Sequence, residues 1–129
     1  MKNINKLERI TSIYNEWIPS DIAFIKEIHW SQNNLKIVSY FQLRDKIDSW
    51  PNFKEKFVEL TINFENISNL KLNFNSSGLH FVSGFDIIDI SNDGLENINF
   101  HIEDYENGSI EFFCEKIEIF SIEEPKLQF

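Results

Sequence analysis

The chain has 129 residues, a formal net charge of −9 at pH 7 and a hydrophobic fraction of 42% that includes thirteen Phe and three Trp. This length and this supply of core residues predict a single folded domain over residues 1–129. The low content of glycine (four) and proline (three) excludes a disordered or low-complexity chain, and the one cysteine, Cys114, excludes an intramolecular disulfide.

The first predicted element is an amphipathic helix over residues 4–17. Between Leu7 and Trp17 the large apolar residues recur at steps of three and four, which places them on one face of a helix. Pro19 ends the helix, because the residue before a proline disfavours the helical conformation. We expect the apolar stripe of this helix to pack on a sheet.

From residue 22 onward the period of the apolar residues changes to two, which is typical of half-buried strands. The expected strands cover residues 22–30, 35–44, 57–64, 69–75, 80–91, 96–104, 109–115 and 117–123. Gly84 is a candidate for a bulge. Asn107-Gly108 predicts a type I′ hairpin turn, since both central residues of that turn need positive φ. Turns about every 8–12 residues predict a mainly β fold, namely an antiparallel sandwich or curved meander of about 7–8 short strands with the N-terminal helix packed on it.

The cellular location is predicted from segments that the sequence lacks. No apolar run approaches the ~18 residues that a membrane-spanning helix needs. Residues 1–6 contain no apolar segment of the kind found in secretory signals. The frequent Ile, Asn, Lys and Phe have A+T-rich codons, which favours a bacterium of low G+C content. We therefore expect a cytoplasmic bacterial protein.

Catalytic motifs are absent from the sequence. It contains no glycine-rich phosphate loop, no nucleophile elbow and no pair of metal ligands at the usual spacings, so we predict no catalytic residue, no metal and no cofactor. His101 and Glu103 share one face of an expected strand, and Asp104 follows, which is the composition of an acid–base site. Any solvent-facing strand shows the same alternation. Cys114 has the parity of core residues and is expected to be buried and inert.

The charge is distributed unevenly along the chain. Residues 1–56 contain nine Lys or Arg and seven Asp or Glu, whereas residues 57–129 contain three and fourteen. Such an acidic half repels nucleic acids and anionic membranes, so neither is an expected partner. A cationic protein would be attracted. The alternative is that the acidic surface serves solubility alone.

The residues expected to contact a partner come from the acidic hairpins and from one aromatic residue in a polar loop. Trp50 either plugs the end of the sheet or anchors a partner, as aromatic residues often do at interfaces. The expected contacts are Glu103, Asp104, Glu111, Glu115, Glu118 and Trp50.

Residues 50–120 carry a recognisable order of segments, which is Trp50-Pro51-Asn52-Phe53, Phe57-Val58-Glu59-Leu60, Asn69-Leu70-Lys71-Leu72 and then acidic hairpins. This order resembles small bacterial immunity proteins of polymorphic toxin systems, with the immunity protein 50 family as the nearest group. The resemblance implies a non-catalytic module that binds and neutralises a cognate toxin, and the acidic surface suits a basic toxin. The residues themselves leave open a small-molecule or lipid-binding β-domain and a structural domain of unknown function.

Overall fold

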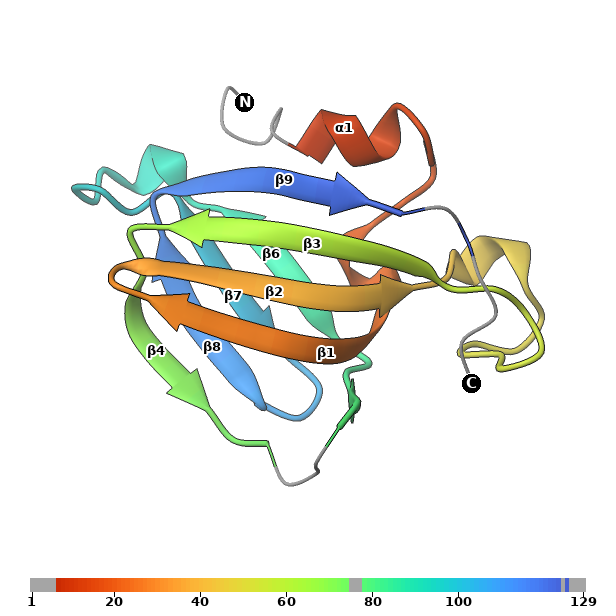
Figure 1. Ribbon diagram of the computed structural model, residues 1–129. Helices are drawn as coiled ribbons and strands as arrows, with labels where there is room; N and C mark the ends of the chain where they lie inside the picture. Colours follow the sequence, from red (N-terminus) through yellow and green to blue (C-terminus); the bar gives the residue numbers. More distant parts are fainter. Residues whose placement is uncertain (1–6, 75–77, 124, 126–129) are drawn as a thin grey trace.

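The fold is known from a computed structural model that describes residues 7–74, 78–123 and 125. These residues form nine strands in two antiparallel sheets and one short α-helix (Figure 1). The predicted mainly β fold with one N-terminal helix is therefore confirmed. The first three residues of the predicted helix and the last residue of the predicted strand 69–75 lie outside the described part of the chain.

The two sheets lie face to face as the layers of a sandwich (Figure 1). The five-stranded sheet has the order β5–β1–β2–β3–β9, with β1 (Ile22–Ser31), β2 (Asn34–Phe41), β3 (Val58–Glu65), β5 (His80–Phe81) and β9 (Lys116–Ile122). The four-stranded sheet has the order β4–β8–β7–β6, with β4 (Ser68–Leu72), β6 (Phe85–Asp89), β7 (Phe100–Asp104) and β8 (Ile110–Cys114). The chain thus changes sheet between β8 and β9, which are consecutive in sequence.

Aromatic side chains fill the space between the sheets. Phe64 on β3 and Phe112 on β8 are both fully buried, and their rings meet edge to face with 5.0 Å between centroids. Such a pair adds to the hydrophobic gain because the positive edge of one ring meets the negative face of the other. This contact joins one sheet directly to the other.

The N-terminal helix is shorter than predicted. The expected helix covered residues 4–17, but α1 covers only Glu8–Thr11, and the segment after it continues as turns. The hydroxyl groups of Thr11 and Ser12 donate hydrogen bonds to carbonyl oxygens three residues back, and this pattern competes with a regular helix. The apolar stripe still reaches the core, where Trp17 is buried and packs edge to face on Phe41. No helix in the described part is long and apolar enough to cross a membrane.

The predicted strand 80–91 is divided into β5 and β6, with Gly84 between them. The carbonyl oxygen of Gly84 accepts a hydrogen bond of 2.9 Å from the amide of Tyr105. A Cβ atom at Gly84 would lie 2.9 Å from the amide nitrogen of Glu106. The loop between β7 and β8 therefore packs so closely on Gly84 that a side chain at this position would clash with it.

Phe112→Ala should lower the free energy of unfolding by about 3–5 kcal/mol, because it removes a buried ring that spans the two sheets and leaves a cavity. The matched control is Phe120→Ala on β9, where the ring is 59% exposed and lies 4.8 Å from the Lys36 ammonium. That change should cost less than about 1 kcal/mol. Chemical denaturation followed by tryptophan fluorescence measures both values, and equal losses would contradict the inward position of Phe112.

Candidate functional site

The candidate site lies on the outer face of the four-stranded sheet. Successive side chains on a strand point to opposite faces. Ile102 on β7 and Phe112 on β8 are fully buried between the sheets, so their neighbours His101, Glu103 and Glu111 point outward. The same outer face carries Asp86 of β6 and Lys71 of β4, as the strand register shows.

Three carboxylates lie side by side across this face, and we call them the acidic row: Asp86, Glu103 and Glu111. Glu103 of β7 is paired directly with Asp86 of β6 on one side and with Glu111 of β8 on the other. Like charges that face each other across strands are destabilising. The Lys71 ammonium, 3.8 Å from Oε1 of Glu111, is the nearest compensating cation in the described structure.

The Glu103 side chain makes no hydrogen bond or ion pair with another described residue, although it is only partly exposed. A carboxylate in this position remains attractive to any cation that approaches the face. Glu103 is therefore the member of the acidic row with the most unsatisfied charge.

His101 is held against the acidic row by two contacts. Its ring stacks on Phe113 with 4.5 Å between centroids and an interplanar angle of 13°. Its Nε2 atom lies 2.8 Å from Oε2 of Glu111. The hydrogen bond from His101 lowers the pKa of Glu111 below its usual value, with a further contribution from Lys71. Glu111 is therefore ionised at neutral pH.

An open hollow of about 410 Å³ adjoins the acidic row on the side of β4. It is lined by Asn69, Leu70, Lys71, Glu111 and Phe113. The hollow combines apolar and charged side chains, which is the composition of a protein-binding surface with an apolar centre and a polar rim.

His101, Glu103 and Glu111 form the one group of three metal-ligating side chains found among the described residues, and the ligand atoms all lie within 4.8 Å of one another. The sequence predicts an acid–base group of His101, Glu103 and Asp104. In the structure the third member of this group is Glu111 and not Asp104, because Glu111 lies opposite Glu103 in the β7–β8 pair. The sequence did not predict Glu111 as a member because it does not give the register of the β7–β8 hairpin.

Asp104, one of the expected partner contacts, does not face outward. Its side chain is buried, with 1% exposure, and one oxygen accepts a 2.6 Å hydrogen bond from the hydroxyl of Ser109. The other oxygen accepts bonds from the amides of Glu106 and Asn107. Asp104 thus closes the β7–β8 loop from within and is not available to a partner.

The predicted type I′ turn at Asn107-Gly108 is also corrected. Of these two residues only Gly108 has positive φ, at 65°. The loop is longer than two residues, because β7 ends at Asp104 and β8 begins at Ile110. The capping bonds of Asp104 favour this longer loop, and it brings Glu103 opposite Glu111.

The other predicted contacts do not join the acidic row. Glu115 lies where the chain passes between the sheets and accepts a 3.2 Å hydrogen bond from the side chain of Asn66. Glu118 is exposed on β9, on the outer face of the five-stranded sheet. The predicted acidic face is therefore divided between the two sides of the sandwich.

Trp50 is half-buried in the segment between β2 and β3. Its indole N–H donates a 2.9 Å hydrogen bond to the carbonyl oxygen of Gln42. The Arg44 guanidinium covers the ring, 3.5 Å from its centroid. These contacts are those of a residue that packs the end of the sheet, and its role as a partner contact stays a prediction.

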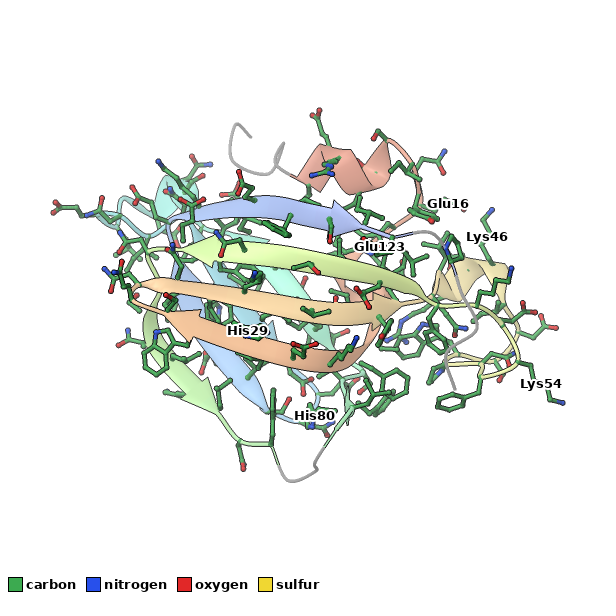
Figure 2. All side chains as sticks on the ribbon, in the orientation of Figure 1. Glu16, His29, Lys46, Lys54, His80 and Glu123 are labelled. Atoms are coloured by element: carbon green, nitrogen blue, oxygen red, sulfur yellow. The ribbon has the colours of Figure 1, made fainter. Side chains whose placement is uncertain are left out.

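The remaining histidines lie elsewhere in the fold. His29 is on β1 and His80 on β5 (Figure 2). Nε2 of His29 lies 2.8 Å from Oε1 of Glu27, two residues earlier on the same strand. This pair resembles His101 and Glu103 in spacing, but no third ligand joins it among the described residues.

Comparison with known proteins adds one finding. The model of a family described as immunity protein PIM8 matches residues 5–120. No curated protein and no solved structure matches the chain significantly. The resemblance to immunity proteins is thus confirmed, and the matched family is PIM8.

Asp104→Ala should lower the free energy of unfolding by about 1–3 kcal/mol, because it leaves the buried Ser109 hydroxyl and two loop amides without their acceptor. Glu103→Gln, one residue away, is the control and should change it by less than about 0.5 kcal/mol. Thermal or chemical denaturation compares the two. A tolerated Asp104→Ala would contradict the capping role.

The Cys114 thiol should be unreactive in the folded protein. Burial raises its pKa to about 12, so almost no thiolate exists at pH 8. A chromogenic disulfide reagent should therefore label Cys114 only after denaturant is added. Labelling of the folded chain at the rate of a free thiol would contradict this placement.

Proposed function

The chain belongs to the immunity protein PIM8 family and so has an immunity-type, protein-binding role, and we propose that it neutralises a cognate toxin through the outer face of the four-stranded sheet. In this proposal the chain acts in the bacterial cytoplasm. The observation that carries the choice of face is the acidic row, in which three carboxylates lie abreast with Lys71 as the nearest compensating cation.

A basic toxin surface is the complement of this row. The charge of Glu103 is not used within the described structure, so a Lys or Arg of a partner gains its full attraction without breaking an existing bond. Phe113 and the hollow beside it supply apolar area next to the charges. Electrostatic attraction speeds the encounter, and apolar burial slows dissociation.

The interior of the sandwich supports a surface role over a carrier role. A small-molecule or lipid carrier needs a hollow interior. The space between these sheets contains large aromatic side chains with at most 1% exposure, which are Phe41, Phe64, Phe85, Phe100 and Phe112. Binding at the outer face requires no change in this packing.

Glu103→Lys should slow association with the cognate toxin domain by about threefold or more at 0.15 M salt. The Debye length there is about 8 Å, so only charges near the interface contribute. Biolayer interferometry on immobilised toxin domain gives the two rate constants. The dissociation rate should change less than the association rate.

Glu118→Lys is the matched control, because it makes the same charge change on the outer face of the other sheet. It should leave association unchanged at 0.15 M salt and slow it only at about 0.01 M, where the Debye length is about 30 Å. An equal effect of both variants at 0.15 M would place the interface elsewhere. Failure of the wild-type chain to bind or protect against this toxin would overturn the proposal.

A further inference from the structure

We propose that His101, Glu103 and Glu111 form a binding site for one divalent transition-metal ion, with Zn²⁺ as the probe. This inference goes beyond the toxin-binding role and does not rest on it. It stands on the convergence of three ligand side chains and on the unsatisfied charge of Glu103.

The sheet itself places the three ligands. His101 and Glu103 are two residues apart on β7, so both point out of the same face. Glu111 lies directly opposite Glu103 on β8. Two ligands from one strand and a third from its antiparallel neighbour are therefore held by backbone hydrogen bonds and not by a loop.

The distances fit an ion with small side-chain movements. Zinc binds nitrogen and carboxylate oxygen at about 2.0–2.2 Å, which puts tetrahedral ligand atoms about 3.3 Å apart. Nε2 of His101 and Oε2 of Glu111 are already 2.8 Å apart, and all three ligand atoms lie within 4.8 Å of one another. Rotation about side-chain bonds is enough to bring the three ligand atoms to the spacing that zinc requires.

Two neighbouring residues orient the ligands. Phe113 fixes the plane of the His101 ring, whose Nε2 is directed at the carboxylates. Lys71 lies near Oε1 of Glu111 and leaves Oε2 for the ion. The stacked ring of Phe113 favours ion binding because it reduces the freedom lost on binding, whereas the positive charge of Lys71 opposes the ion. An ion bound at Nε2 of His101 replaces the proton that this atom directs at Glu111, and that proton leaves to solvent.

The charge of the site is an independent reason for a cation. Glu103 and Glu111 face each other across the strands, and a like-charged pair in this position is unfavourable. A divalent ion between them removes the repulsion and neutralises both. One imidazole nitrogen with two carboxylate oxygens suits Zn²⁺, whereas Ca²⁺ and Mg²⁺ take oxygen ligands. Three protein ligands leave a fourth position for water.

Isothermal titration calorimetry with ZnCl₂ tests the site on the purified full chain, freed of metal with a chelator and with no toxin present. We expect saturable binding of one ion per chain. Glu103→Gln should weaken it at least tenfold. This variant loses no hydrogen bond or ion pair to a described residue, so it should remain folded. His101→Asn should abolish binding.

The control is His29→Asn, which removes the histidine of the other His–Glu pair, on β1. It should leave zinc affinity unchanged, because no third ligand accompanies His29 and Glu27 among the described residues. The absence of saturable binding to the wild-type chain would overturn the proposal. So would full affinity in Glu103→Gln or loss of binding in His29→Asn. None of these results depends on a toxin.

Discussion

Two sheets pack over an interior filled by phenylalanine, and this packing determines which side chains reach the surface. Phe112 must face inward to meet Phe64 of the other sheet, and Ile102 is buried beside it. Because strand side chains alternate, this packing forces Glu103 and Glu111 to the outside. A slip of one residue in the β7–β8 pairing would move the core side chains of one strand to the surface. Burial of these side chains therefore also fixes which residues face each other on the outer face.

Repulsion within the acidic row lowers the stability of the fold, and the packing of the core compensates for it. Glu103 and Glu111 face each other directly and repel, and the aromatic packing below them offsets this repulsion. A basic protein surface and a divalent ion both relieve the same repulsion. The two proposals therefore have one physical origin, and an ion bound at His101 would weaken the attraction of this face for a basic partner.

A buried carboxylate links the local sequence to the geometry of the site. Asp104 accepts hydrogen bonds from the hydroxyl of Ser109 and from amides of the loop between β7 and β8. These bonds stabilise a loop longer than the tight turn that Asn107-Gly108 predicts, and the pairing of Glu103 with Glu111 follows from that loop length. Asp104, which the sequence predicts as a partner contact, instead determines which residues occupy the acidic row.

The mainly β class, the positions of most strands and the inward parity of Phe112 and Cys114 follow from the amino-acid sequence alone. Apolar residues at every second position depend only on neighbours along the chain. The sequence also indicated the immunity family and the pairing of His101 with Glu103. The strand order, the change of sheet after Cys114 and the place of Glu111 beside Glu103 became known from the folded structure. The strand order depends on hydrogen bonds between residues far apart in the chain, and the place of Glu111 depends on the loop that the buried Asp104 closes.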